Sequence, residues 1–315
     1  MITRAGIEGL EEYKVSKEGD IVLKHRVLTA ILGIPLLIGL IYAGSTPLFL
    51  AVLVVFVLGM REFINIAEKA GYSPLKISMY IGGFLLIGEA YLFGGAFATF
   101  FFFIVFMLLA IELLLSNKIS LAAMAVSFFG VIYLSLLKYI LLLRGYPYQG
   151  FAFNEGFALI LTAFILTWTV DTGAYFSGKS FGSRKLAPGI SPNKTLEGAI
   201  GGTIAAMLMA VVLYFTLIPD GIPIFAGANG IFYAILLGFL VSVSGQMGDL
   251  LESLLKRSAN VKDSGNILPG HGGILDRFDS ILFTVPVTYY FIISVGYWSL
   301  LCICSPVPGF IIIGQ

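Results

Sequence analysis

Charged residues are scarce in this chain of 315 residues. Lys, Arg, Asp and Glu together make up 12% of it, against about 25% in an ordinary soluble domain. Apolar residues account for 58% of the chain, and the mean hydropathy is +0.96. This composition excludes an ordinary soluble domain and predicts an integral membrane protein.

The chain also lacks net charge and has almost no cysteine. A formal net charge of +1 provides no basic field, so we expect no nucleic-acid partner. Cys302 and Cys304 lie two apart in an apolar run without acidic or histidine neighbours. This setting favours apolar packing over a disulfide, a metal site or a redox pair.

The first 26 residues are mostly polar and carry both signs of charge. A cleavable signal peptide would have a short basic start and reach its apolar core sooner, so we expect the first apolar run to be retained as an anchor. The predicted organisation is a cytoplasmic segment at 1–26, a transmembrane domain at 27–305 and a tail at 306–315.

Long apolar runs recur along the chain, and about 20 such residues span the hydrocarbon core as a helix. We therefore predict an all-α polytopic bundle of about nine transmembrane helices. The predicted spans are 27–44, 47–66, 76–94, 97–117, 120–143, 156–177, 195–217, 229–252 and 279–304. Glycines in the seventh span, such as Gly198, Gly201 and Gly202, allow close helix approach.

The basic residues predict the orientation of these spans. With a cytoplasmic N-terminus, sixteen of the 19 Lys and Arg residues fall in inside segments, and only Arg144 falls in an outside loop. Cytoplasmic segments of membrane proteins carry such an excess of Lys and Arg. The polar loops at 171–197 and 249–279 are then both cytoplasmic.

Several acids occur within or beside the apolar runs. Asp171 and Asp249 lie late in the sixth and eighth runs, where a carboxylate usually has a partner because burying it at the centre of a span costs about 2.5–3.5 kcal/mol. A metal ion or a basic side chain could be this partner, and solvation at headgroup level is the alternative. For Glu89 and Glu112, which have no motif around them, structural pairing or a helix end is favoured.

The second polar loop combines acids, bases and glycines. Asp249, Glu252 and Lys256 share a helical face by their spacing, and Asp276 and Asp279 share one if their turn is helical. Carboxylates suit Mg²⁺, which takes further ligands from water and phosphate. Basic residues that can contact phosphate are Lys256, Arg257, Lys262 and Arg277. Glycines that let backbone N–H groups approach an anion are Gly265, Gly270, Gly272 and Gly273.

These residues together favour a nucleotide or polyphosphate site over an ordinary loop between two helices. His271 is open to two interpretations. Its usual titration range suits a general base, but a phosphate nucleophile needs little proton removal, so a loop-organising role is at least as well supported.

The first polar loop contains two further patterns. Residues 173–180 match the phosphate-binding pattern GxxxxGK[ST], but that pattern requires a preceding β-strand, and a membrane helix precedes it here, so we interpret the match as coincidence. Ser191, Asn193, Lys194 and Thr195 precede the seventh span, whose helix N-terminus attracts anions. Capping by Ser191 or Asn193, with Glu197 in the first turn, is an alternative or concurrent role.

The run Ser253-x-x-Lys256-Arg257, Lys262-Asp263, Pro269-x-His271-Gly272-Gly273-x-x-Asp276-Arg277-x-Asp279 resembles the signature of the phosphatidate cytidylyltransferases, also called CDP-diacylglycerol synthases. The stretches DTGAYFSGKSFG and KLAPGISPNKTLEG resemble a second region of that family. The resemblance implies transfer of the cytidylyl group of CTP to phosphatidic acid, which gives CDP-diacylglycerol and pyrophosphate in phospholipid biosynthesis. It also implies dependence on Mg²⁺.

The resemblance assigns roles to single residues. The implied metal ligands are Asp249 and Asp276 first, then Asp171 and Asp279, with a second cation left open. The implied catalytic residues are Asp249, Asp276, Lys256, Arg277 and His271. The implied substrate-binding residues are Ser191, Asn193, Lys194, Arg257, Lys262, Gly272 and Gly273.

The expected partners are CTP, phosphatidic acid and membrane lipids, with a homodimer left open. The expected location is the bacterial inner membrane, with the site facing the cytoplasm. A CTP-dependent lipid kinase and a transporter of anionic solutes are the alternatives. Against a transporter, the motifs cluster on one side of the membrane, whereas transport sites usually lie near its midplane.

Overall fold

The computed structural model describes residues 31–116, 120–145, 154–218, 222–225, 228–267 and 272–303, with only the backbone described from residue 296 onward. Several predictions fall outside these ranges. They concern the N-terminal segment at 1–26, His271 and Gly270, the side chains of Cys302 and Cys304, and the tail at 306–315.

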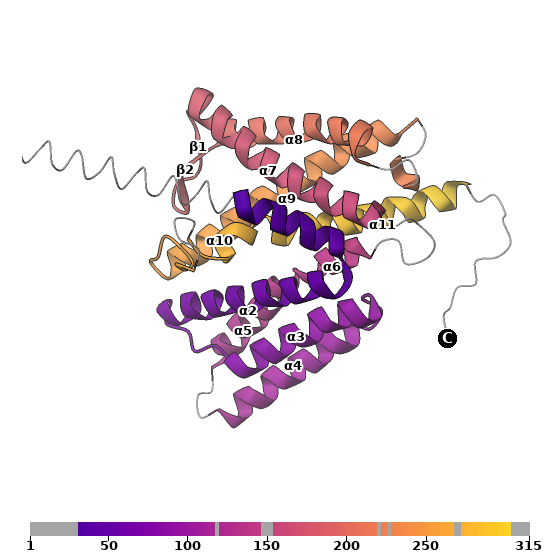
Figure 1. The fold of residues 1–315 in the computed structure, drawn as a ribbon. Helices are drawn as coiled ribbons and strands as arrows, with labels where there is room; N and C mark the ends of the chain where they lie inside the picture. The colour runs from indigo at the N-terminus through magenta and orange to yellow at the C-terminus, as the bar shows by residue number, and fades with distance from the viewer. Residues whose placement is uncertain are drawn as a thin grey trace, which may run out of the picture. The chain divides into compact units, whose positions relative to one another are not determined.

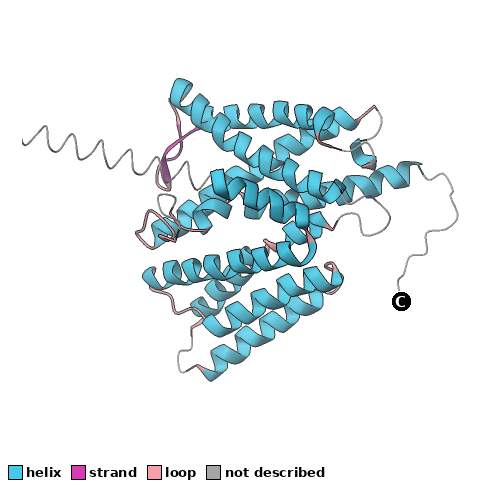
Figure 2. Cartoon of the chain, viewed as in Figure 1, coloured by secondary structure: helices cyan, strands magenta, loops and turns pink. Residues whose placement is uncertain are grey.

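The prediction of an all-α polytopic membrane protein is confirmed. Within the described ranges, eight helical segments are long and apolar enough to cross a membrane. They correspond to the second to ninth predicted spans. A shorter apolar helix, Ile31–Ala43, covers part of the first span. Figure 2 shows how helices dominate the described chain.

The chain divides into two compact units, one formed by Met1–Leu141 with Leu251–Asp279 and the other by Leu142–Leu250 with Ser280–Gln315. The helices that lie wholly in the first unit are α2 (Ser45–Lys69), α3 (Lys76–Phe93), α4 (Ala98–Leu115), α5 (Leu121–Ser135) and α10 (Leu275–Phe278). In this unit α3 packs against α4 and α5, and α2 packs against α3 and α5 (Figure 1). The ring of Phe56, fully buried, occupies the space that the missing side chain of Gly83 leaves on α3.

Two acids of the first unit have structural partners, as predicted, and both partners are N–H groups at the start of a helix. The carboxylate of Glu112 accepts a hydrogen bond from the backbone N–H of Ser78, in the first turn of α3, at 2.6 Å. The carboxylate of Glu89 accepts one at 2.9 Å from the N–H of Phe97, the residue that precedes α4. These N–H groups have no partner within their own helix, so a carboxylate from a neighbouring helix satisfies them.

The second unit contains α7 (Asn154–Phe181), β1 (Lys185–Ala187), β2 (Ser191–Thr195), α8 (Leu196–Thr216), η1 (Pro223–Phe225) and α11 (Ile281–Ile303). Helices α6 (Lys138–Arg144) and α9 (Gly230–Ser258) each contribute residues to both units. Helices α7 and α8 make the most extensive contact in this unit. A Cβ atom at Gly202 would lie 2.7 Å from the carbonyl oxygen of Val170, so glycine permits this close approach.

The described helices differ from the predicted spans in three places. Helix α7 continues to Phe181, and α9 continues to Ser258. The predicted span 120–143 contains two helices, α5 and α6, separated by a turn at residues 136–137. Polar residues at the end of a span satisfy their backbone groups by continuing the helix, so the end of an apolar run does not determine the end of the helix.

A short antiparallel pair of strands, β1 and β2, was not predicted. Lys185 pairs with Thr195, and Ala187 pairs with Ser191. The five residues of β2, SPNKT, have no alternation of apolar and polar side chains, so hydrophobic periodicity could not reveal the strand. By contrast, residues 173–180 lie inside α7, which confirms that their match to the phosphate-loop pattern is coincidental.

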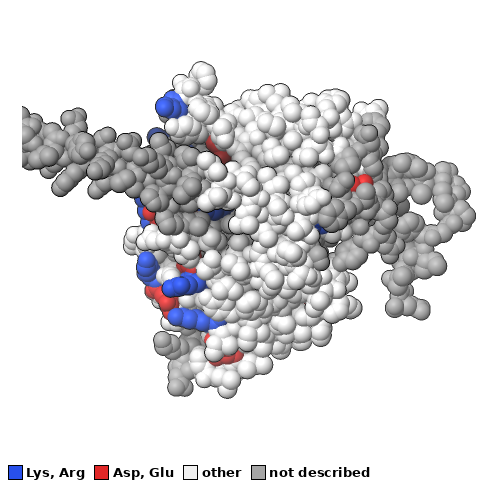
Figure 3. All heavy atoms as spheres, in the orientation of Figure 1, with Lys and Arg blue, Asp and Glu red and all other residues white. Residues whose placement is uncertain are grey.

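Wide areas of the surface carry no charged residue in the view of Figure 3. Exposed large side chains include Phe100, Phe103, Leu208 and Phe232. Such exposure would be a liability in water, but it suits contact with lipid.

We predict that Gly202→Val destabilises the packing of α7 on α8, since the added side chain overlaps the backbone of α7. The expected cost is about 1–3 kcal/mol, measurable as a lower midpoint of thermal denaturation in detergent. Gly88→Val is the matched control, because a Cβ atom at Gly88 would meet nothing within 4 Å. Equal midpoints for the two variants would contradict the prediction.

Candidate functional site

A cavity of about 610 Å³ opens in the second unit between α7, α8, α9 and the β1–β2 hairpin. We call it the hairpin pocket. The predicted site residues that line it are Asp171, Ser191, Asn193, Lys194 and Asp249. The structure therefore brings together five residues that the sequence divides among three separate segments.

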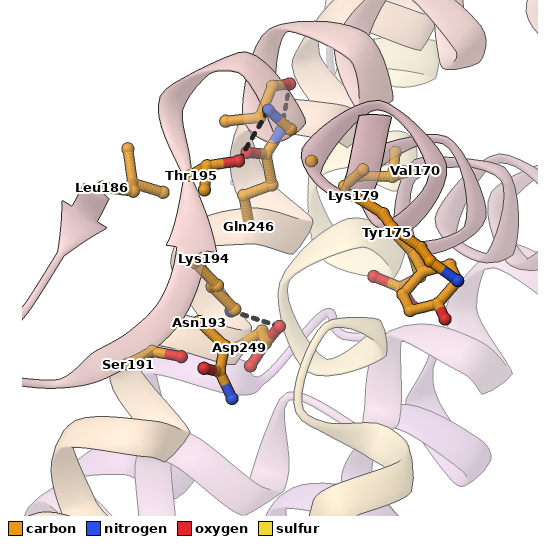
Figure 4. Close-up of a pocket in the computed structure, with 15 residues that line it drawn as sticks. Val170, Tyr175, Lys179, Leu186, Ser191, Asn193, Lys194, Thr195, Gln246 and Asp249 are labelled. Atoms are coloured by element: carbon orange, nitrogen blue, oxygen red, sulfur yellow. Dashed lines mark hydrogen bonds and ion pairs between the residues drawn. The ribbon is translucent and has the colours of Figure 1, made fainter. Parts of the chain in front are cut away.

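An ion pair between Lys194 and Asp249 joins β2 to α9 in this pocket. The two side chains point toward each other in the close-up of Figure 4. They are 28% and 30% exposed, so solvent and ions reach both. An ion pair this accessible contributes little to stability, and either partner can turn toward an incoming charged ligand. Of the partners that the sequence leaves open for Asp249, the structure shows a basic side chain, Lys194.

The N-terminus of α8 borders the same pocket. Thr195 is the N-cap: its Oγ1 accepts a hydrogen bond at 3.1 Å from the backbone N–H of Gly198. The prediction that Ser191 or Asn193 caps this helix is wrong, because the helix begins at Leu196 and both residues belong to β2. Their side chains line the pocket instead.

The predicted place of Glu197 in the first turn of α8 is confirmed. Its carboxylate accepts hydrogen bonds from the N–H and hydroxyl of Ser183, at 3.0 and 2.7 Å, and from the N–H of Arg184. These bonds tie the segment after α7 to the start of α8, so they fix the base of the hairpin that carries Lys194.

Tyr175, Lys179 and Gln246 also line the hairpin pocket but were not predicted. The ammonium of Lys179 lies 5.9 Å from the ring centroid of Tyr175, one turn earlier on α7. The amide of Gln246 donates to Ser242 at 2.8 Å and to the carbonyl oxygen of Ala199 at 3.3 Å. Gln246 thereby links α9 to α8 and helps to position Asp249, one turn later.

A second group of polar residues lies in the first unit. The ammonium of Lys256 contacts the carboxylate of Glu252 at 2.5 Å and that of Asp276 at 2.7 Å. All three side chains are largely buried, with exposures of 14%, 1% and 9% respectively. The predicted shared face of Glu252 and Lys256 is confirmed, and Asp276 joins them from α10. We call Glu252, Lys256 and Asp276 the buried triad.

Backbone and hydroxyl groups complete the surroundings of Asp276. Its Oδ2 accepts hydrogen bonds from the N–H groups of Ser264, at 3.0 Å, and Gly273, at 2.8 Å. The sequence predicts that the N–H of Gly273 can approach an anion such as a substrate phosphate. In the structure it bonds to the protein's own carboxylate, so a contact with phosphate would require that bond to open.

The remaining predicted residues are more exposed. The side chains of Arg257, Lys262 and Arg277 are exposed, and Gly272 has a φ of +81°, which favours glycine. Asp279, half-buried, is the C-cap of α10, and its N–H bonds to Leu275. Asp276 and Asp279 thus share a helical turn, as predicted.

The predicted Mg²⁺ ligands can be compared with these surroundings. Within the described ranges, no three Asp, Glu, His or Cys residues are placed to hold a metal ion together. Mg²⁺ usually takes one or two carboxylates and completes its shell with water and substrate phosphates. Asp171 and Asp249, which line one solvent-accessible pocket, fit that requirement. Asp276 is held by Lys256 and by backbone donors.

The sequence profile of the cytidylyltransferase family matches residues 24–295. The chain belongs to the cytidylyltransferase family. The match covers nearly every described helix of both units, so the hairpin pocket and the buried triad lie inside the family domain. The resemblance inferred from the sequence motifs is thereby confirmed.

Relatives of this cytidylyltransferase-family chain align over almost their whole length. The phosphatidate cytidylyltransferase of Bacillus subtilis is 35% identical over 274 residues, which cover 85% of this chain and 97% of that protein. Those of Staphylococcus haemolyticus and Staphylococcus aureus are 33% and 32% identical over 277 residues. Each alignment covers 84% of this chain and 97% of the relative.

We predict that Thr195→Ala lowers stability by about 1 kcal/mol, because it removes the N-cap of α8. The measurement is the midpoint of thermal denaturation in detergent. Ser191→Ala provides the control, since Ser191 lies in the same strand and caps no helix. A larger loss of stability in Ser191→Ala than in Thr195→Ala would contradict the assignment of the cap.

Proposed function

We propose that this chain transfers the cytidylyl group of CTP to phosphatidic acid, which yields CDP-diacylglycerol and pyrophosphate. The observation that carries the proposal is the hairpin pocket, in which acids and a lysine from three elements converge beside a helix N-terminus within the family domain. The printed names of the relatives support the same reaction.

The proposed chemistry is an in-line displacement at phosphorus. An oxygen of the lipid phosphate attacks the α-phosphorus of CTP, the bond to the β,γ-diphosphate breaks, and pyrophosphate leaves. Both the attacking and the leaving group are anionic, so the protein acts by positioning them and neutralising their charge. No strong base is needed, because the lipid phosphate is already ionised near neutral pH.

The residues of the hairpin pocket suit this task. Lys194 can turn from Asp249 to a phosphate oxygen, and the N–H groups at the start of α8 favour an anion at the same place. Ser191 and Asn193 supply polar groups at the rim. Asp171 and Asp249 would hold Mg²⁺, and when bound it would neutralise charge on the triphosphate.

The segment from Lys256 to Arg277 supplies the other predicted groups. Arg257, Lys262 and Arg277 are exposed cations for the triphosphate or the lipid phosphate. Lys256 is held between Glu252 and Asp276, so its ammonium has a defined position. Asp276 and Asp279 are the further proposed metal ligands, and they would hold Mg²⁺ or a second cation.

The proposed location is the bacterial inner membrane, with the site on the cytoplasmic side. The excess of Lys and Arg in the segments assigned to that side supports this orientation. A site at the interface lets the lipid substrate remain in its leaflet while CTP arrives from water.

The test uses the purified full chain in vesicles that contain phosphatidic acid, with CTP labelled at the α-phosphate. We expect label to enter the lipid phase and pyrophosphate to be released, and both to require Mg²⁺. Labelled CDP in the water phase with an unlabelled lipid product would indicate the lipid kinase instead. Counterflow of an anionic solute without any chemical product would indicate the transporter. Either result would overturn the proposal.

We predict that Asp249→Asn and Asp276→Asn each lower this transfer by at least about 100-fold, since each removes a charge needed to organise cations around the triphosphate. The measurement is the rate of label transfer at saturating substrates and Mg²⁺. Glu68→Gln is the control, because Glu68 forms an exposed ion pair with Lys76 and belongs to neither group. Turnover near the original rate in both aspartate variants would refute the metal assignment.

A further inference from the structure

Glu62, on α2, is a buried acid that belongs to none of the sequence motifs. Its residue is 2% exposed. Its Oε1 accepts a hydrogen bond from the N–H of Ile274 at 3.0 Å, and its Oε2 accepts one from the N–H of Leu275 at 2.9 Å. The hydroxyl of Ser264 donates to Oε2 at 2.9 Å. The carboxylate therefore bonds to the signature segment from more than 200 residues away in the chain.

These bonds supply what the start of α10 lacks. The N-cap residue of α10 is Ile274, whose side chain has no hydrogen-bonding group, and the helix begins at Leu275. The first N–H groups of a helix have no partner within it, and leaving them unpaired in a buried place is costly. Glu62 therefore performs the capping role from another helix.

The glycines around Glu62 fit the same interpretation. A Cβ atom at Gly265 would lie 2.5 Å from Oε1 of Glu62. One at Gly273 would lie 2.5 and 2.6 Å from its two carboxylate oxygens. Such distances are far shorter than van der Waals contact, so a larger residue at either position would displace the carboxylate of Glu62. The backbone of this segment does approach an anion closely, and that anion is the protein's own Glu62.

The segment that Glu62 holds also holds Asp276. The N–H of Gly273, next to Ile274, donates to Asp276, which in turn contacts Lys256. The hydroxyl of Ser264 lies 2.9 Å from Glu62 and 3.0 Å from Asp276. Because a hydroxyl has one proton, it can donate to only one of these carboxylates at a time. The positions of the two acids are thereby coupled through shared backbone and one shared hydroxyl.

We propose that Glu62 is a positioning residue that holds Asp276, and through it Lys256, in place for the reaction. Glu62 itself need touch neither substrate. Its carboxylate fixes the backbone at 273–275, and that backbone fixes the carboxylate of Asp276. The relevance to catalysis rests on the proposed function, in which Asp276 and Lys256 act on the substrates or their cation.

The test compares Glu62→Gln with Glu68→Gln in the full chain in detergent or vesicles. Glutamine keeps the size of Glu62 but replaces one acceptor oxygen with an NH₂ group, so a donor then faces a donor. Glu68→Gln is matched because it makes the same change on the same helix, at an exposed ion pair.

The first readout is hydrogen–deuterium exchange of peptides that contain Ile274 and Leu275, without any substrate. We expect exchange at these amides to become at least about tenfold faster in Glu62→Gln, since loss of the hydrogen bond removes protection, and to be unchanged in Glu68→Gln. Unchanged exchange in Glu62→Gln would show that Glu62 does not hold the segment, and it would overturn the proposal.

The second readout is the Mg²⁺ concentration for half-maximal cytidylyl transfer. Loss of a residue that orients a metal-binding group typically costs about 10–100-fold in metal affinity or activity. We expect a rise of at least about tenfold in Glu62→Gln and none in Glu68→Gln. A mere loss of folded protein lowers the maximal rate but leaves this concentration unchanged. Faster exchange with an unaltered Mg²⁺ requirement and rate would overturn the positioning role.

A second variant covers the case in which Glu62→Gln does not fold. Ser264→Ala removes the shared hydroxyl and leaves the backbone bonds of Glu62 intact, so we expect a several-fold rise in the Mg²⁺ requirement. An unaltered requirement would overturn the proposal.

If the unmodified chain transfers no label from CTP to lipid, the proposed function fails. The exchange experiment still decides whether Glu62 holds the segment.

Discussion

Removing a carboxylate from water costs several kcal/mol unless hydrogen-bond donors or cations replace the lost solvent. In this chain many of those donors are the N–H groups at the start of a helix. Glu112 bonds to α3, Glu89 bonds to the residue before α4, and Glu62 bonds to α10. In each case the acid lies on a different helix from the one it caps. One bond therefore satisfies two groups and also fixes two elements relative to each other.

The same requirement organises the signature segment. Its glycines look suited to a phosphate, since a backbone without Cβ atoms lets N–H groups approach an anion. The described N–H groups of Gly273, Ile274 and Leu275 bond instead to Asp276 and Glu62. The protein's own carboxylates thus accept hydrogen bonds from the N–H groups that the glycine motif could otherwise offer to a phosphate. The described backbone at 273–275 is thus held by the protein's own carboxylates.

Charge is arranged differently in the two groups of polar residues. Lys194 and Asp249 form an accessible pair in the hairpin pocket, where a ligand can replace either partner. Lys256 is buried between two carboxylates and keeps a defined position. An exchangeable pair suits binding of charged substrates, and a buried pair suits the orientation of a fixed group. Both arrangements belong to the domain that defines the family.

The apolar runs by themselves determined the fold class and the approximate place of eight long spans, because spanning length and hydrophobicity are local properties of the chain. The motif residues likewise pointed to the family. The β1–β2 hairpin, the Lys194–Asp249 pair and the cap at Thr195 could not be located in this way. Only the tertiary structure joined Glu62 to residues 264–275, since a contact across 202 residues leaves no periodic signal in the sequence. The hydrogen-bond donors around a buried acid are determined by its neighbours in the folded chain, so no local sequence pattern predicts them.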